Sequence, residues 1–382
     1  MTRVPVPPQM LRWVCERAGY DVAHLAERIP QLPAWIRRER QPTMNQLEKL
    51  AKVTHTPLGY LFLPNPPDER LPVPDYRTVA SAALGRPSPN LLDTLYAMLR
   101  RQEWMRESLV ENDVEPLAFV ASARLTDEPN AVGREMRRTL GLDGGWAAGV
   151  RTWQDAVSEM RRAIEQIGVM ALINGVVGNN THRRLSVEEF RGFALTDPYA
   201  PLIFVNGADA KSAQMFTLAH ELAHIWLGTE GVSGFEALFP GGSDVEDWCN
   251  RAAAELLAPA RELRGRWREV RREASPFQEL ARTFKVSPIV AARRALDLNL
   301  VDRSTFFDFY KGYVNREHKG ATKSSGGDFY NNQNTRVGEL FGVQVLRAAL
   351  EGRIGFKEAY DLTGLRGGTF QKYAKRLGVD LP

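Results

Sequence analysis

Apolar residues recur at helical spacing over much of the chain, and only a short central stretch breaks that period. Spacing of three and four residues predicts helices over Pro89–Asp113, Pro129–Leu140 and Trp153–Ile167. After Gly168 the pattern favours strands, which we place at Val169–Asn174, Phe190–Asp197 and Pro201–Asn206. The chain is therefore expected to be a predominantly helical α+β protein with one small sheet, and an exposed edge strand of that sheet could hold an extended peptide.

The most apolar helical stretch, FTLAHELAHIWLG at 216–228, contains three ionisable residues, His220, Glu221 and His224. Residues four apart share one face of a helix, so the two imidazoles can bind one metal ion while Glu221 lies beside its open side. Zinc bound in this way leaves a position for water, and Glu221 is then the expected general base. The alternative is a pair of core histidines that hydrogen bonds satisfy.

A third ligand is expected from the segment VEDWCNRAAAELLAP at 245–259, which begins with acids at a helix N-terminus. We choose Glu246, with Asp247 as the second candidate and Glu255 as the third. The competing interpretation is that Glu246 only complements the helix dipole.

These two blocks together resemble the ImmA/IrrE family of zinc metallopeptidases. The family pattern is His-Glu-x-x-His followed by Glu-x-x-Ala-Asn-x-Phe-Ala-Ala-x-Leu-Leu-x-Pro, and this chain departs from it at Cys249 and Ala252. The resemblance implies a zincin-like domain with His220, His224 and Glu246 as zinc ligands and Glu221 as the base. It also implies cleavage of a partner repressor or antitoxin, which we expect to be encoded nearby.

The N-terminal segment has short amphipathic stretches, LRWVCERAG, DVAHLAERI and LEKLAKV, around a basic piece that contains Arg37, Arg38 and Arg40. It resembles the Cro/C1-type (XRE-like) helix-turn-helix domain of repressors, although Leu25 and Trp35 lie too close in sequence for a full recognition helix. The three arginines are candidate phosphate contacts. Equally, the fold can serve protein contacts or homodimerisation.

Proline-rich and Gly/Ser-rich stretches divide the chain, and we expect a flexible joint at 317–328 and a Gly-rich loop at 231–244, after the metal helix. We expect a helix-turn-helix domain at 1–64, a linker at 65–88, the peptidase domain with its preceding helices at 89–316, and C-terminal helices at 317–382. Phe277–Val301 is expected to form a structural helical hairpin. The segment 356–378 has the spacing of a minimal helix-turn-helix, for which we favour packing or oligomerisation over DNA contact.

The amino-acid composition limits the broad class of protein but does not identify its function. Hydrophobic content of 43% and charged content of 25% are typical of a soluble globular protein, and no stretch resembles a signal peptide or a membrane span. We therefore expect a cytoplasmic protein. The sequence predicts a zinc-dependent endopeptidase that regulates transcription or a stress response, and the alternative is a DNA-binding regulator or antitoxin whose peptidase fold senses or docks a partner.

Overall fold

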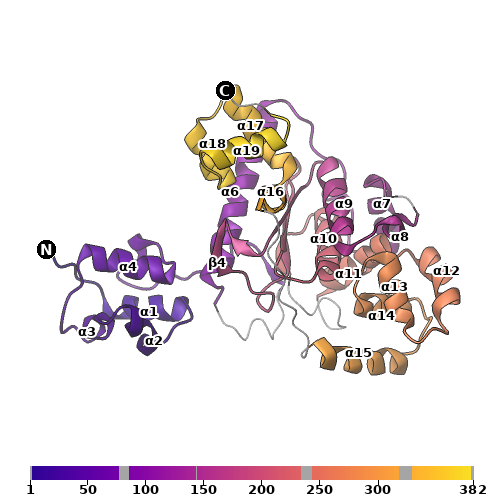
Figure 1. Cartoon of the computed structure of the whole chain (residues 1–382), viewed down its shortest axis with the longest axis horizontal. Coiled ribbons are helices and arrows are strands. Elements are labelled where there is room, and N and C mark those ends of the chain that lie inside the picture. The colour runs from indigo at the N-terminus through magenta and orange to yellow at the C-terminus, as the bar shows by residue number, and fades with distance from the viewer. Residues whose placement is uncertain (1, 77–85, 143, 234–242, 318–328, 380–382) are drawn as a thin grey trace. The chain divides into compact units, whose positions relative to one another are not determined.

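The computed structural model describes residues 2–76, 86–142, 144–233, 243–317 and 329–379 (Figure 1). These residues form two compact units. The first holds residues 2–72 and 86–96, and the second holds residues 73–76 and 97–379. Three of the expected connecting segments lie partly outside the described residues. The parts concerned are 77–85 of the linker, 234–242 of the glycine-rich loop after the metal helix, and 318–328 of the C-terminal joint.

The first unit is a small helical bundle of α1 (Pro8–Arg17), α2 (Val22–Arg28), α3 (Leu32–Ile36), α4 (Met44–Thr54) and η1 (Leu58–Phe62). Local sequence sets the helix starts, because Asp21 caps α2 and Thr43 with Gln46 forms a capping box on α4. The core contains Leu11, Leu25, Leu47 and Trp35. Helix α3 has only five residues, so the second helix of the motif is as short as the sequence indicated.

The second unit is built on a five-stranded mixed sheet in the order β1-β7-β5-β6-β2. The predicted strands are confirmed as β2 (Met170–Asn174), β5 (Gly192–Leu195) and β6 (Leu202–Asn206). Sequence patterns missed β1 (Asp75–Tyr76), β7 (Gly231–Ser233) and a separate hairpin of β3 (Val176–Val177) and β4 (Asn180–Arg184). Residues 231–233 were expected in a loop, so that expectation is wrong for them.

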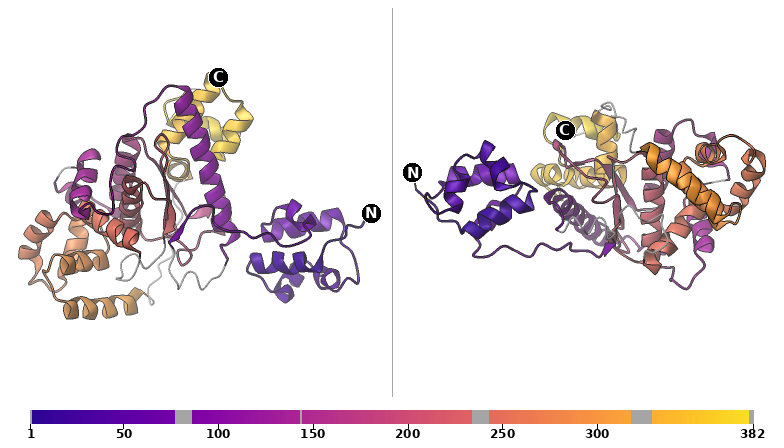
Figure 2. Two further views of the ribbon diagram at one scale, coloured as in Figure 1. Left: turned by 180° about the vertical axis from the view of Figure 1, so that it is seen from behind. Right: turned by 90° about the horizontal axis from the view of Figure 1, so that it is seen from below.

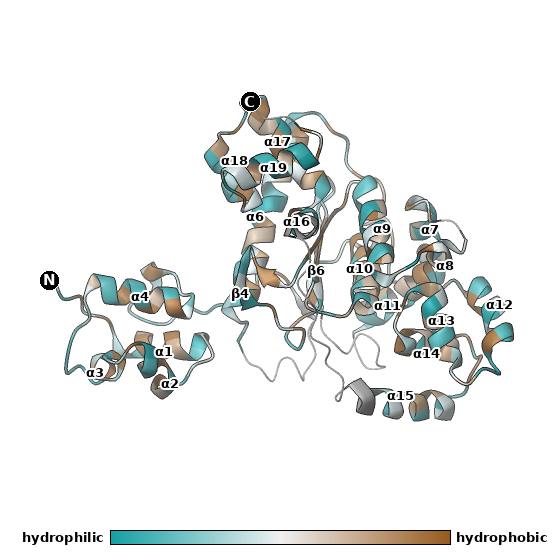
Figure 3. Ribbon diagram, in the orientation of Figure 1, coloured by the Kyte–Doolittle hydropathy of each residue, from teal (hydrophilic) through white to brown (hydrophobic). Residues whose placement is uncertain are grey.

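Pairing directions place β5 at the centre of the sheet. It runs antiparallel to both β6 and β7, whereas β2 is parallel to β6 and β1 is parallel to β7. All residues of β2, β5, β6 and β7 are buried, which fits the apolar strands in Figure 3. The sequence did not indicate which strand forms each edge of the sheet, and the end strands are β1, which pairs with β7, and β2.

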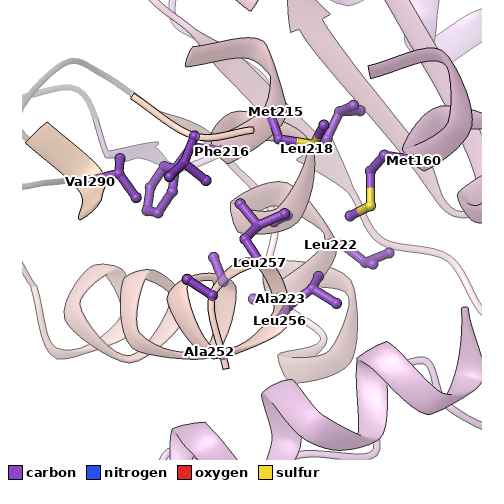
Figure 4. Close-up of a cluster of buried hydrophobic side chains, with 14 of the residues drawn as sticks. Met160, Met215, Phe216, Leu218, Leu222, Ala223, Ala252, Leu256, Leu257 and Val290 are labelled. Atoms are coloured by element: carbon purple, nitrogen blue, oxygen red, sulfur yellow. The ribbon is translucent and has the colours of Figure 1, made fainter. Parts of the chain in front are cut away.

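Helix α10 (Lys211–Leu227) packs against β5, β6, α9 (Trp153–Gln166) and α11 (Asp244–Leu257), and α11 packs against α7 (Pro129–Thr139). Apolar side chains from α9, α10 and α11 form one core, of which Figure 4 shows Met160, Leu218, Leu222 and Leu256. Burying such side chains contributes roughly 1.5–3 kcal/mol each. Helices α10 and α11 are therefore held firmly side by side.

Five more helices of the second unit precede its C-terminal helices: α8 (Trp146–Gly149), α12 (Ala260–Val270), α13 (Pro276–Phe284), α14 (Pro288–Asp297) and α15 (Arg303–Glu317). The predicted hairpin of residues 277–301 is confirmed as α13 and α14, joined by Lys285 in a left-handed conformation. Ala291, Ala292 and Ala295 are fully buried, so α14 packs as a structural helix.

The C-terminal helices are α16 (Phe329–Val337), α17 (Glu339–Leu350), α18 (Phe356–Thr363) and α19 (Gly368–Arg376). They pack against the sheet, α9 and the part of α6 (Pro89–Glu111) that belongs to this unit, as Figures 1 and 2 show. Arg101 of α6 donates to the backbone oxygens of Arg336 and Leu362, and Glu165 of α9 accepts from the backbone N–H of Glu339. Within the described ranges, no helix is long and apolar enough to span a membrane.

Candidate metal centre

Helix α10 carries His220, Glu221 and His224 in its buried C-terminal half. The helix ends at Gly228, whose φ of 69° is the left-handed conformation that favours glycine. A side chain there would meet Ala121, because a Cβ atom on Gly228 would lie 2.5 Å from that of Ala121. The motif is thus fixed by a tightly packed helix end.

Helix α11 brings Glu246 to the two imidazoles. Ser243 caps this helix by accepting from the backbone N–H of Glu246, so the acid lies in the first turn. One Glu246 oxygen lies 3.2 Å from Nε2 of His220, and the other lies 3.2 Å from Nε2 of His224. The two Nε2 atoms are also 3.2 Å apart. All three side chains are buried.

The other two candidates for the third ligand lie elsewhere. Asp247 is exposed. Glu255 is buried against Arg294, with which it forms an ion pair, and it also contacts Arg134. The acid that the structure brings to the imidazoles is Glu246, the first choice from the sequence.

These donor distances fit a tetrahedral metal ion. Zinc binds imidazole nitrogen at about 2.0–2.1 Å, and two ligands of a tetrahedron of that size are roughly 3.3 Å apart. The distance of 3.2 Å between the two Nε2 atoms matches that edge, and each Nε2 atom lies 3.2 Å from a different oxygen of Glu246. Without a cation, the two imidazoles and the Glu246 carboxylate share a histidine proton through the hydrogen bond between His220 and Glu246, and a bound cation would take the place of that proton. The residues therefore fit a divalent metal.

Thr229 is a functional candidate that sequence reasoning missed. Its Oγ1 lies 2.9 Å from Nδ1 of His224. If Nδ1–H donates to this hydroxyl, Nε2 of His224 keeps its lone pair and points at the metal position. The only signal in the sequence is a hydroxyl residue directly after Gly228.

Burial dominates the pKa of Glu221 and raises it to about 8. Neighbouring His220 opposes this shift and the Glu246 carboxylate adds to it. Among the described residues, neither oxygen of Glu221 makes a hydrogen bond of standard geometry, although the nearby Ser233 side chain lowers the pKa slightly. The strand β5 lies close over this acid, since a Cβ atom on Gly192 would be 2.9 Å from Oε1 of Glu221. Glu221 is therefore a buried acid that holds its proton more tightly than an exposed glutamate in the metal-free protein.

Burial also acts on the three donors. It would raise the pKa of Glu246, but His220 and His224 outweigh it and hold that pKa well below its usual range. Burial lowers the pKa of His224. It would lower that of His220 as well, but the charge of Glu246 and its hydrogen bond raise the pKa on balance. Glu246 is thus an anion in the folded protein, as a metal ligand must be.

The three candidate DNA contacts of the N-terminal unit, Arg37, Arg38 and Arg40, lie just after α3 and are exposed. Arg37 forms an ion pair with Glu39 at 2.6 Å, and Arg38 has a φ of 63°. Both cysteines, Cys15 and Cys249, are free and buried, and burial raises the pKa of each thiol. Neither thiol is therefore poised as a thiolate ligand.

The second unit thus combines a small mixed sheet with a helix on which two histidines and an acid lie close to a third possible ligand from a neighbouring helix. This arrangement is found in metal-dependent hydrolases. Residues 167–296 match the model of the IrrE N-terminal-like domain of the peptidase M78 family. This segment contains β2 to β7 and α10 to α14, and so includes His220, Glu221, His224 and Glu246. It is similar to a metallopeptidase-type family with regulatory members.

The C-terminal helices have a separate match. Residues 337–376 match the model of a domain of unknown function, DUF8813, which covers α17 to α19. No curated protein matches the chain.

Proposed function

We propose that the chain is a zinc-dependent endopeptidase that cleaves a regulatory partner, a repressor or an antitoxin. The observation that carries the proposal is the buried cluster of His220, His224 and Glu246, whose possible ligand atoms lie within 4.8 Å of one another, with Glu221 next to His220 on the same helix. The family match of residues 167–296 supports the peptidase class. Repressor or antitoxin cleavage rests on the resemblance of these motifs to the ImmA/IrrE family.

His220, His224 and Glu246 would hold the metal, and Thr229 would keep the tautomer of His224 that binding requires. Zinc, when bound, supplies a Lewis acid and lowers the pKa of water towards neutrality. Glu221 takes a proton from the attacking water and returns it to the leaving amine. Its burial and its place next to His220 on α10 put this carboxyl group beside the position where the metal would hold the attacking water.

The closest competing function is a DNA-binding regulator that uses the peptidase fold for sensing or docking. The helical N-terminal unit and its exposed Arg37, Arg38 and Arg40 favour DNA contact. Helix α3 is too short to read bases in the way of a full recognition helix, so these arginines would supply phosphate attraction rather than sequence readout. We therefore keep peptide hydrolysis as the primary function.

One experiment separates the two functions. Zinc-loaded wild type and Glu221→Gln are incubated with the products of neighbouring genes, and both proteins are tested in a gel shift on the promoter of their own gene. The proposal predicts a defined cleavage product with wild type only, and equal zinc content in both proteins. The opposite result, a gel shift without cleavage of any neighbour, would make the regulator the better description.

A further inference from the structure

The outer edge of β7 is occupied by the chain's own segment between the two units. Asp75 pairs with Val232 and Tyr76 pairs with Ser233, in parallel register. The backbone N–H of Val232 donates to the backbone oxygen of Pro74 at 3.0 Å. Strand β1 is the end strand of the sheet, and it has only two residues.

This edge belongs to the candidate metal centre. Ser233 at the end of β7 pairs with Gly192 of β5, and its backbone oxygen accepts from the N–H of Arg191 at 3.0 Å. Gly192 is the residue that lies over the Glu221 carboxylate, and the Ser233 side chain also faces that acid. The opposite end strand, β2, packs against α9 and α16. The β7 edge is therefore the sheet edge that borders the reacting groups.

The strand that covers this edge has a ladder of only two residue pairs. Pro74 has no N–H, so β1 cannot extend its ladder of donors towards its N-terminal side. Backbone hydrogen bonds contribute roughly 0.5–1.5 kcal/mol each, so a pairing of two residues contributes little. An extended peptide that pairs with more of the edge can compete with it.

We propose that the β7 edge is the docking site for an extended peptide substrate and that residues 74–76 fill it as an internal blocking strand. This inference rests on the peptidase function proposed above. A substrate must displace β1 before its backbone can pair with β7 next to Glu221. Val73 directly follows Pro72, where the N-terminal segment of the first unit ends. The blocking strand is therefore joined by a short stretch of backbone to the unit that a partner would engage.

The test uses the full chain and one substitution that removes a backbone donor. In a parallel ladder with this register the N–H of Tyr76 faces the oxygen of Val232, and Tyr76→Pro removes it while keeping the extended backbone. Tyr76→Ala is the matched control, since it shortens the side chain but keeps the N–H. Both are made in zinc-loaded Glu221→Gln protein, so that binding is measured without cleavage.

The first readout is hydrogen exchange at the Val232 amide, with the Phe204 amide of β6 as the check that the sheet is intact. Tyr76→Pro should speed exchange at Val232 and leave Phe204 unchanged. The second readout is binding of fluorescein-labelled casein, a protein with extended backbone. If β1 covers the edge 90–99% of the time, its release should tighten binding by roughly 10- to 100-fold, whereas Tyr76→Ala should resemble the parent.

Equal binding by Tyr76→Pro and its parent, or unchanged exchange at Val232, would overturn the proposal. A Tyr76→Pro protein that keeps Glu221 then tests the docking edge and the peptidase function separately. If Tyr76→Pro with Glu221 binds casein more tightly but does not cut it, the docking edge stands and the peptidase function fails. If it cuts casein faster than wild type, both hold.

Discussion

The hydrogen bond between Thr229 and His224 gives the sharpest prediction about the metal site. Thr229→Val replaces the hydroxyl with a methyl group of similar size and leaves Nδ1–H of His224 without its partner at 2.9 Å. The His224 side chain is only 1% exposed, so water cannot easily replace the lost hydroxyl. The change therefore acts on the imidazole rather than on packing.

Two independent arguments give a similar free-energy cost for this substitution. Removing the partner of a histidine ligand typically lowers metal affinity by about 10–100-fold, which is roughly 1.4–2.7 kcal/mol. Leaving a buried donor unsatisfied costs about 1–3 kcal/mol. We expect Thr229→Val to bind zinc 10- to 100-fold more weakly than wild type, and Thr229→Ser, which keeps the hydroxyl, to remain within a few-fold.

The assay is competition for zinc against a chromogenic chelator of known affinity, with unfolding curves of the metal-free proteins as a control for folding. Weaker binding that appears in Thr229→Val alone supports the orienting role. The reasoning is refuted if Thr229→Val and wild type bind zinc equally while both are folded.

Three further predictions concern the surroundings of the site. Gly133→Ala in α7 should destabilise the protein by about 1–3 kcal/mol in chemical unfolding, because the new Cβ would lie 2.5 Å from the backbone oxygen of Ala252 in α11. The control is Gly265→Ala, in open space on α12, which should be neutral or stabilising. A loss of stability of the same size in the control would contradict the packing argument. Burial raises the pKa of Glu165 from 4.5 to about 7, against the opposing charge of Arg161, so the folded state holds the extra proton between these values and the free energy of unfolding should fall as pH rises through that window. The fall should be on the order of 3 kcal/mol and be absent in Glu165→Gln; identical pH profiles would exclude this origin. Arg294→Met should cost about 3–5 kcal/mol, since it removes the buried partner of Glu255 and leaves only the long contact with Arg134 and one backbone N–H. A change below about 1 kcal/mol in the same unfolding assay would show that the ion pair is not needed.

Local patterns predicted the parts of the fold that local forces determine. The apolar surroundings of His220, Glu221 and His224 predicted a buried helix, and the glycine that follows predicted where it ends. The strands β2, β5 and β6 were found because each is four or five residues long and apolar. The choice among three acids for the third ligand needed the packing of α11 on α10, although the first turn of α11 pointed to Glu246.

Features that depend on distant parts of the chain could not be predicted. Strands β1 and β7 have two and three residues, too few for any period, and they exist because residues 75–76 meet residues 232–233. This pairing also decides that β1, and not β7, is the end strand of the sheet. Likewise, the burial of Glu255 against Arg294 joins residues 39 positions apart and has no local signal.

X-ray absorption at the zinc edge of the purified, zinc-loaded chain tests the central claim most directly. We predict one zinc per chain, with only nitrogen and oxygen neighbours at about 2.0–2.2 Å, a clear signal of two imidazoles, and loss of bound zinc in a His220→Ala, His224→Ala double variant. A sulfur shell at about 2.3 Å, or zinc that remains in the double variant, would contradict the site.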